Sequence, residues 1–457
     1  SPGSRNDFNT ILKFNLDVDS NDDSLSLDSI YYYEELFSKI YNDLKQKNLI
    51  DLLEKIENPL SYVLMKMEFE GIKLDSDLIK ETKEIFEFEI NKLETKIYNI
   101  SETEFNIASP KQLGEVLFEK LVLESNPKKT KTGQYSTSED TLSKLAKKHE
   151  IIRLILEWRS LQKLLTTYVY SLPKQIHPKS NKIHTEFNQT LTTTGRLSST
   201  NPNLQNIPVR TARGKLIRKS FIPKNKNYTL LCADYSQVEL RIIAFLSGDS
   251  NMKNAFINNE DIHRSTAARV FNVNIDDVNE EQRRNAKIVN FGIIYGVSAF
   301  GLSNQTDLTR SESKEIINNY FKSYPKLKEY MSDQISFARN NGYVETILKR
   351  KRYLPEINSR NAILRSSAER NAINTPVQGS AADIIKLSMI KIDHEFEKRS
   401  LSSKLLLQVH DELVFDVHLS EIDIVKKIII DNMENVIQMD VPLKVDIGFG
   451  DNWLLAH

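Results

Sequence analysis

The amino-acid sequence predicts an α+β fold, in which helical segments and antiparallel strands occupy separate stretches of the chain. Three observations support this class. The first third has mostly helical periodicity, and short threonine-rich runs with an alternating pattern begin near Pro178. An apolar hairpin, KLLLQVHDELVFDV, follows a second helical stretch near the end of the chain. With 457 residues, the chain is long enough for two to four domains or subdomains.

The helices of the first third follow from apolar spacing and capping signals. Residues 31–57 carry apolar residues at helical spacing, and residues 75–101 are expected to form one long amphipathic helix. SPKQLGEVLFEKL opens with Ser109 as N-cap and Pro110 at the first helical position. The acidic stretch 16–29 is expected to be a loop. The expected core contacts of the long helix are Leu78, Ile85, Phe88, Ile90, Leu93 and Ile97.

Strands are expected in the second part of the chain. KIHTEFNQTLTTTGRLSS is predicted to form strands joined by a turn, and YTLLCADYS a buried strand that ends near Asp234. Residues 255–375 are predicted to be mostly helical. The C-terminal hairpin turns at HDE, which contains Asp411.

One helical segment, RRNAKIVNFGIIYG, combines cations, aromatic rings and glycines. Four of its residues are spaced four apart and so share one helix face: Arg283, Lys287, Phe291 and Tyr295. Cations suit a triphosphate, and aromatic rings suit a base or a sugar. Gly292 and Gly296 each weaken a helix interior by about 1 kcal/mol relative to alanine, which indicates bending or a close approach by another group. By spacing alone, an amphipathic core helix with two cations is an equal alternative.

Two aspartates at predicted strand ends form a candidate metal site. Asp234 and Asp411, if brought together, offer the hard oxygen ligands that Mg²⁺ prefers. Two such ions can clamp the attacking and leaving oxygens of an in-line displacement at phosphorus. Aspartates are common in turns, and a separation of 177 residues does not by itself bring these two side chains together.

Charge is unevenly distributed, although the net charge is zero. Residues 1–58 contain twelve acidic and six basic residues, a balance of −6, so residues 59–457 carry +6. Two basic segments in that part, NPKKTKTG and ILKRKRYLPEINSRNAILRSSAER, suit phosphate contacts, with a solvated surface as the alternative. No apolar run approaches the ~20 residues that span a membrane. The single cysteine, Cys232, excludes a disulfide within the chain.

The combination of these segments resembles the family A DNA polymerases of the bacterial polymerase I type. LLCADYSQVELRIIAFLSGD is similar to motif A of the family, RRNAKIVNFGIIYG to motif B, and LLLQVHDELVF to motif C. TTGRLSSTNPNLQNIPVR, EDIHRSTAARVF, ERNAINTPVQGSAADIIK and GDNWLLAH resemble further family segments. The resemblance extends from about Asn58 to the C-terminus.

The resemblance implies a role for individual positions. The metal-binding groups would be the carboxylates of Asp234 and Asp411 and the backbone carbonyl of Tyr235, with Glu412 as a nearby secondary acid. Contacts to the incoming dNTP would come from Arg283, Lys287, Phe291, Tyr295, His263, Gln237 and Glu239. Of these, Lys287 would also act in catalysis. Glu239 would be the steric gate against a ribose 2′-hydroxyl. Contacts to the primer–template would come from Arg196, Asn203, Gln205, Asn374, Gln378 and His410, with Arg370 on the template side.

The implied fold is a right-hand polymerase with an antiparallel palm sheet, a helical thumb and helical fingers. The expected division is a junction segment at 1–57, a thumb at 58–179, palm at 180–250 and 381–457, and fingers at 251–380. The implied function is a DNA-directed DNA polymerase, a nucleotidyltransferase of DNA replication and repair. The implied cofactor is a pair of Mg²⁺ ions, for which Mn²⁺ can substitute. The implied partners are primer–template DNA and dNTPs, without a membrane, and a monomer is expected.

Three further expectations accompany this reading. Residues 1–57 are expected to be a remnant of a 3′–5′ exonuclease domain without its catalytic sheet, so no proofreading is expected. A bacterial source would place the protein in the cytoplasm, with a plastid or mitochondrion as the alternative. In the family, phenylalanine at position 291 goes with discrimination against dideoxynucleotides. The alternatives are a single-subunit RNA polymerase, which Glu239 in SQVEL argues against, and an inactive DNA-binding scaffold.

Overall fold

The computed structural model describes residues 8–16, 27–306 and 308–457. Its contacts divide the chain into two compact units. Unit 1 comprises the chain up to Glu70, Glu186–Thr200 and Leu231–Gly448, and unit 2 comprises Gly71–Thr185, Asn201–Leu230 and Phe449–His457. Residues 17–26 of the predicted loop at 16–29 lie outside the described residues, and the prediction is wrong for its two ends, which belong to α1 (to Leu16) and α2 (from Leu27). In the part of the chain that the structure describes, no helix is long and apolar enough to cross a membrane.

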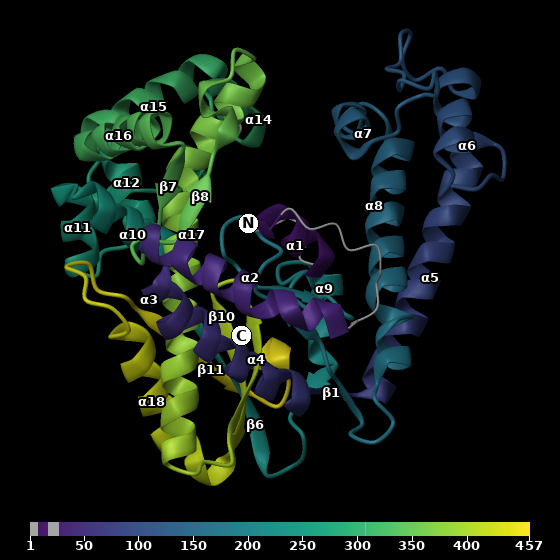
Figure 1. Cartoon of the computed structure of the whole chain (residues 1–457). Coiled ribbons are helices and arrows are strands. Elements are labelled where there is room, and N and C mark those ends of the chain that lie inside the picture. Colours follow the sequence, from purple (N-terminus) through teal and green to yellow (C-terminus); the bar gives the residue numbers. More distant parts are fainter. Residues whose placement is uncertain (1–7, 17–26, 307) are drawn as a thin grey trace. The chain divides into compact units, whose positions relative to one another are not determined.

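The helices of unit 1 surround one long helix, α17 (Ala362–Lys398). This helix contacts α4, α10, α16 and α18, and it runs beside α18 in Figure 1. The helices of unit 1 are α1 (Phe8–Leu16), α2 (Leu27–Gln46), α3 (Ile50–Leu52), the π-helical turn Leu53–Glu57, α4 (Asn58–Glu70), α10 (Val238–Ser247), α11 (Ser250–Ile257), α12 (Ile262–Phe271), α13 (Glu280–Ile294), α14 (Ala299–Gln305), α15 (Arg310–Ser323), α16 (Pro325–Asn341), α17 and α18 (Ile422–Glu434).

The central sheet of unit 1 has the strand order β11-β6-β10-β9. Its strands are β6 (Tyr228–Tyr235), β9 (Lys404–Val409), β10 (Glu412–His418) and β11 (Val445–Gly450). β9 and β10 form the predicted antiparallel hairpin, in which Glu412 pairs with Val409 and Leu413 with Gln408. β6 is buried along most of its length because its side chains from Thr229 to Ala233 are apolar or small. The predicted buried strand and hairpin are therefore both confirmed.

Two short antiparallel pairs complete the strands of unit 1. β3 (Glu186–Asn188) pairs with β4 (Ser198–Thr200), which confirms the strands and turn predicted in the threonine-rich stretch. β7 (Tyr343–Glu345) pairs with β8 (Lys351–Tyr353). This second hairpin interrupts the stretch 255–375, which was expected to be mostly helical. Its strands are only three residues long, too short for an alternating pattern to stand out.

Unit 2 contains a three-stranded antiparallel sheet of order β2-β1-β5 and a set of helices. In its packing, α5 contacts α8, and Trp453 of α19 lies edge-on to Phe221 beneath the Arg218 guanidinium. Its elements are β1 (Ile72–Leu74), α5 (Ser76–Ser101), α6 (Pro110–Glu115), α7 (Glu139–Leu145), α8 (Glu150–Leu164), β2 (Lys182–Ile183), α9 (Ala212–Lys219), β5 (Phe221–Ile222) and α19 (Trp453–Ala456).

The long helix predicted at 75–101 is α5, but its buried face differs in part from the prediction. Asp75 caps the helix by accepting from the backbone N–H groups of Asp77 and Leu78. The expectation for Leu78, Ile85 and Phe88 is wrong: Leu78 is half-buried, and the other two are exposed. The buried face instead consists of Ile79, Thr82, Phe86, Ile90, Leu93 and Ile97. Apolar residues occur on both faces of this helix, so apolar character alone does not identify the packed one.

The start of α6 is as predicted. Ser109 caps it by accepting from the backbone N–H of Gln112, and Pro110 occupies the first turn.

The five-part division into junction, thumb, palm and fingers is finer than the two units. Residues 58–70, assigned to the thumb, belong to unit 1 by contacts, whereas 71–179 belong to unit 2. The five-part division stays a prediction.

Candidate functional site

Adjacent strands bring the two predicted aspartates to one edge of the central sheet. β6 and β10 are neighbours in the sheet, and the backbone N–H of Tyr235 donates to the carbonyl oxygen of Asp411 at 3.1 Å. Asp234, one residue earlier, is therefore held beside the β9–β10 turn. Both aspartate side chains are half-buried. The backbone hydrogen bond holds side by side the two segments that carry these carboxylates and that are far apart in sequence.

A third acid, Glu239, lies beside these aspartates and is almost fully buried. β6 leads through Ser236 and Gln237 into α10, so Glu239 falls in the first turn of that helix. Its carboxylate accepts from Arg196 Nη2 at 2.6 Å and from the Tyr295 hydroxyl at 2.6 Å. Arg196 Nη2 also lies 3.9 Å from Asp411 Oδ1. We call Asp234, Glu239 and Asp411 the acidic cluster.

Burial raises the pKa values of two members of the acidic cluster, Asp411 and Glu239. Burial raises the pKa of Asp411, and the charge of Arg196 only partly offsets that effect. Burial likewise raises the pKa of Glu239, although the Tyr295 hydrogen bond and the Arg196 charge act to lower it. The Tyr295 pKa is also raised, first by burial and then by Glu239. The shifts of Asp411 and Glu239 have the direction expected of acids whose burial outweighs the charge of a nearby cation, Arg196.

α13 presents the predicted cationic and aromatic face to solvent. Asn279 and Gln282 form a capping box at its start, and its opposite face is buried by residues such as Val289 and Ile293. The four residues of the predicted face are all half-buried or exposed: Arg283, Lys287, Phe291 and Tyr295. The opposite face of α13 is the packed one, as it would be in either interpretation, and Phe291 on the predicted face lies against the buried His263 ring.

The two glycines of this segment have different environments. Gly292 lies inside α13, where an added Cβ would come within 2.8 Å of Val297 Cγ1. Gly296 lies outside the helix, because α13 ends at Ile294 with Tyr295 as C-cap. Gly296 has φ +72°, and an added Cβ would come within 2.7 Å of Arg370 Cγ. The expectation that both glycines interrupt one continuous helix is wrong for Gly296, which ends it in the left-handed conformation that favours glycine.

The residues around the cationic end of α13 are tied to α12. Arg283 Nε donates to Asp261 at 2.8 Å, and Asp261 also caps α12. The His263 ring is buried, lies 5.8 Å from the Phe291 ring and contacts Asn290 through Nδ1 at 3.0 Å. Burial lowers the pKa of His263 to about 4, and the charges of Lys287 and Arg283 act in the same direction. His263 is therefore a neutral imidazole near pH 7.

The residues predicted to contact primer–template DNA fall in both units. On α17, Arg370 is exposed and Gln378 half-buried. The side-chain oxygen of Asn374, also on α17, is buried and receives no hydrogen bond from any residue that the structure describes. His410 is exposed in the β9–β10 turn with φ +55°. Asn203 and Gln205 belong to unit 2, where the Gln205 backbone N–H donates to Asn203 Oδ1 at 3.0 Å.

The remaining predicted residues lie near the acidic cluster. Gln237 is half-buried and begins α10 in the left-handed conformation, with φ +53°. The Tyr235 side chain points into the core, where its hydroxyl contacts Ser388 Oγ and the Met433 carbonyl. Glu412, the first residue of β10, directly follows Asp411 of the β9–β10 turn and is buried.

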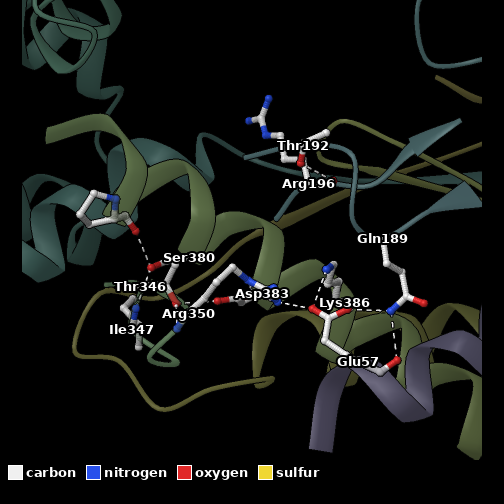
Figure 2. Close-up of polar contacts among 11 residues, drawn as sticks. Glu57, Gln189, Thr192, Arg196, Thr346, Ile347, Arg350, Ser380, Asp383 and Lys386 are labelled. Carbon is white, nitrogen blue, oxygen red and sulfur yellow. Dashed lines mark hydrogen bonds and ion pairs between the residues drawn. The ribbon is translucent and has the colours of Figure 1, made fainter. Parts of the chain in front are cut away.

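A second set of charges in unit 1 was not predicted. Glu57, Arg350, Asp383 and Lys386 form a group that we call the balanced cluster, since it has two acids and two cations (Figure 2). Arg350 bonds Glu57, and its Nε donates to Asp383 at 2.7 Å. Lys386 is fully buried and donates to Glu57 at 2.8 Å. The ADIIK and KRKR segments that supply three of these residues gave no pairing signal, because the partners are up to 329 residues apart.

The oxygen donors of the acidic cluster fit a hard divalent cation better than a soft one. Among the described residues, no cluster of three or more His, Cys, Asp or Glu side chains is placed to hold a metal ion. The predicted set is smaller than that, since it combines two carboxylates with one backbone carbonyl. The half-buried Asp411, whose pKa burial raises and which lies near the partly exposed Arg196, is compatible with such a set.

The site therefore combines an acidic cluster at a sheet edge with an accessible helix of cations and aromatic rings, as in proteins that bind nucleotides and transfer phosphoryl-type groups. The family model DNA polymerase family A matches residues 76–455. The chain is 48% identical over 420 residues to DNA polymerase I of Bacillus subtilis, covering 92% of this chain and 48% of that protein. It is 50% identical over 440 residues to DNA polymerase I of Caldicellulosiruptor bescii, covering 96% and 51%.

A solved structure, the POL domain of Pol1 from M. smegmatis in complex with DNA primer–template and dNTP, has a TM-score of 0.93. The two are 38% identical, with 100% of this chain and 80% of that chain covered. The chain belongs to DNA polymerase family A. This confirms the resemblance found in the sequence and the predicted α+β polymerase fold class. Family A polymerases use divalent metal ions, and the chain spans about half the length of the curated relatives it matches.

Proposed function

We propose that this chain is a DNA-directed DNA polymerase that adds dNTPs to a primer 3′-hydroxyl on a DNA template. The observation that carries the proposal is the acidic cluster at the edge of the central sheet, beside the solvent-facing α13. The M. smegmatis relative binds a DNA primer–template and a dNTP, which supports the same partners here. The bacterial relatives support a role in bacterial DNA replication and repair and a cytoplasmic location.

In this proposal, Asp234, Asp411 and the Tyr235 carbonyl hold two Mg²⁺ ions, which supply Lewis-acid stabilisation of the attacking and leaving oxygens. The primer 3′-oxygen forms a bond to the α-phosphorus, and the bond to the bridging oxygen breaks. Pyrophosphate leaves, and the hydroxyl proton passes to solvent. Little covalent chemistry is asked of the protein, so its side chains act by positioning and charge.

The individual side chains divide this work. Arg283 and Lys287 neutralise the triphosphate, and Phe291 packs against its sugar and base. Glu239 occupies the space of a ribose 2′-hydroxyl, because Arg196 and Tyr295 hold its carboxylate from two sides. The Asn374 side-chain oxygen has no hydrogen-bond partner among the described residues, so it can accept from the N2 amino group of a guanine in the minor groove. Arg283 must exchange its bond with Asp261 for one with phosphate as the nucleotide binds.

Extension of a labelled primer on a longer template, with Mg²⁺ and dNTPs, tests the proposal. The parent protein is expected to extend, Asp411→Asn is not, and Asp393→Asn serves as the matched control. Asp393 bonds Lys66 elsewhere in unit 1 and contacts no residue of the acidic cluster. If the parent binds the primer–template, as measured by fluorescence anisotropy, and does not extend it, the scaffold alternative is correct. Extension with rNTPs at the rate of dNTPs would favour an RNA polymerase.

A further inference from the structure

The balanced cluster joins four segments of unit 1 that are distant in sequence. Glu57 ends the π-helical turn before α4, Arg350 stands in the β7–β8 turn, and Asp383 and Lys386 lie on α17. The Thr346 hydroxyl donates to Asp383 at 2.6 Å and fixes the hairpin on α17. The fourth segment is the β3–β4 loop, residues 189–197, of which Gln189 lies beside Glu57 in Figure 2, whereas Thr192 and Arg196 lie farther from the cluster.

Two kinds of contact hold this loop against the balanced cluster. Gln189 at its start donates to both the carboxylate and the backbone carbonyl of Glu57, at 2.6 and 3.0 Å. Gly195 near its end has φ +81°, and an added Cβ would come within 2.6 Å of Cδ and Nε of Arg350. That Nε is the atom that donates to Asp383. The backbone of Gly195 therefore packs directly against the Arg350 side chain, which leaves no room for a side chain at position 195.

The residue after Gly195 reaches the acidic cluster. The Arg196 carbonyl accepts from the Thr192 hydroxyl at 2.6 Å, which closes the loop, and its guanidinium bonds Glu239. Arg196 is only partly exposed, at 29% of its side chain, so its direction is set by the loop that carries it. A path of direct contacts runs from Arg350 through Gly195 and Arg196 to Glu239.

We propose that Arg350 is a positioning residue, which holds the β3–β4 loop so that Arg196 fixes the Glu239 carboxylate against a ribose 2′-hydroxyl. The inference rests on the proposed polymerase function. Lysine cannot replace the arginine here. A single ammonium does not bond Glu57 and Asp383 in the planar fork of a guanidinium, nor does it offer Gly195 the same flat surface.

A double-mutant cycle tests the proposal in the full chain, using single-nucleotide insertion of a dNTP and of the matching rNTP. The four proteins are the parent, Arg196→Ala, Arg350→Lys and the double variant. Arg350→Lys is expected to lower the dNTP/rNTP preference at least about fivefold, within the range measured for residues in contact. In the Arg196→Ala background the same change is expected to alter that preference less than about twofold, the usual limit of additivity error.

Lys66→Met is the matched control, because it removes two ion pairs to α17, with Asp393 and Glu397, without touching the loop. The control is expected to keep the parent's nucleotide preference. Gly195→Ala perturbs the same contact from the side of the loop, and it is expected to lower the preference as Arg350→Lys does. It replaces Arg350→Lys in the cycle if that variant does not fold.

Hydrogen exchange of the peptide 189–200 gives a readout that does not depend on activity. Exchange is expected to accelerate in Arg350→Lys and to stay unchanged in Lys66→Met. An unchanged preference in Arg350→Lys, or effects that multiply in the double variant, would overturn the positioning role. If the parent inserts no nucleotide, the polymerase proposal itself fails, and the exchange data then decide whether Arg350 holds the loop.

Discussion

The balanced cluster and the acidic cluster both lie in unit 1, and they differ in charge balance. The balanced cluster pairs two acids with two cations, and hydrogen bonds connect all four side chains. The acidic cluster has three acids, and Arg196 lies near two of them, Glu239 and Asp411. Burial alone would raise the pKa of Glu57, but Lys386 and Arg350 bring it below its usual range. The pKa values of Asp411 and Glu239 are raised, and so is that of Asp383 in the balanced cluster, where burial outweighs the charges of Arg350 and Lys386.

Charge balance and exposure separate structural charge from charge available to a ligand. Each carboxylate of the balanced cluster bonds a cation of the protein, Glu57 with Lys386 and Asp383 with Arg350. Asp411 is half-exposed at a sheet edge, where it is placed to receive a cation from outside. The two clusters therefore predict opposite responses to the same chemical change, the removal of one carboxylate charge.

The largest expected effect is on stability, at the balanced cluster. Glu57→Gln leaves Arg350 and Lys386 with a single acid, and removing one partner of a buried pair typically destabilises by about 3–5 kcal/mol. Urea unfolding measures the change. Glu397→Gln is the matched control, because its bond to Lys66 is half-exposed and is expected to contribute less than about 1 kcal/mol. Equal losses in the two variants would show that the balanced cluster does not stabilise the fold.

A second change at the same place sharpens this prediction. Lys386→Met combined with Glu57→Gln restores charge balance, because it removes one cation along with one anion. The double variant is expected to be more stable than the sum of the two single losses predicts, since contacting residues are coupled. Urea unfolding of all three variants checks it. Strict additivity would mean that Lys386 and Glu57 act independently.

The next effect is on turnover, at the acidic cluster. Asp234→Asn is expected to lower turnover by about 10²–10³-fold, the range seen when a group that stabilises transition-state charge is removed. Its free energy of unfolding is expected to change less than that of Glu57→Gln, because Asp234 is half-buried at a sheet edge, whereas Glu57 bonds the buried Lys386. Single-turnover insertion and urea unfolding measure the two quantities. A loss of stability similar to that of Glu57→Gln would contradict the distinction between the clusters.

Adding Mg²⁺ tests whether the acidic cluster binds a cation. Folding raises the pKa of Asp411, so its contribution to stability is present at low pH and lost as pH rises through the folded pKa. Mg²⁺ binding opposes that loss, and at ten times its Kd it is expected to stabilise by about 1.4 kcal/mol. The stabilisation should be smaller at pH 5 than at pH 7.5, since protons compete for the same oxygens. Thermal unfolding with and without Mg²⁺ measures it.

Two variants serve as controls for the metal effect. Asp411→Asn should lose the Mg²⁺-dependent stabilisation, whereas Glu57→Gln should retain it in full. Equal stabilisation of the parent and Asp411→Asn would place the metal elsewhere on the protein.

The smallest effect on stability is expected at α13, outside both clusters. Phe291 lies on the accessible face of that helix, so Phe291→Tyr is expected to change stability by less than about 0.5 kcal/mol. The variant is nevertheless expected to incorporate dideoxynucleotides far more readily, as the family relationship implies. Competition between ddNTP and dNTP in primer extension measures this preference. An unchanged preference would contradict the placement of this helix at the nucleotide.

The sequence predicted the acidic cluster and missed the balanced one, for a physical reason. Asp234 and Asp411 stand in segments that carry their own signals, an apolar strand and a hairpin turn, and the family motifs link the two. Glu57 stands at the end of a helix that looked like a separate junction, and Arg350 in a basic stretch that suggested a surface. Only tertiary packing joins them, since their side chains meet across 293 residues.

Local structure was predicted best where capping residues and apolar runs agreed. The Ser109 cap, the strand ending at Tyr235 and the C-terminal hairpin are examples. Phe88 shows the opposite case, because α5 carries apolar residues on both faces and only its neighbours decide which one is buried. Gly296 shows a second limit, since a helix interior and a helix end can share the same local sequence until the φ angle is known.

The most direct test of the account compares Asp411→Asn with Glu57→Gln in one experiment, by primer extension at 20 °C and thermal unfolding of the same samples. The account predicts that Asp411→Asn unfolds at the parent's temperature or above and does not extend the primer. It predicts that Glu57→Gln unfolds at a clearly lower temperature and still extends at 20 °C. If Asp411→Asn extends as the parent does, or if the two variants lose stability equally, charge imbalance does not mark the functional site.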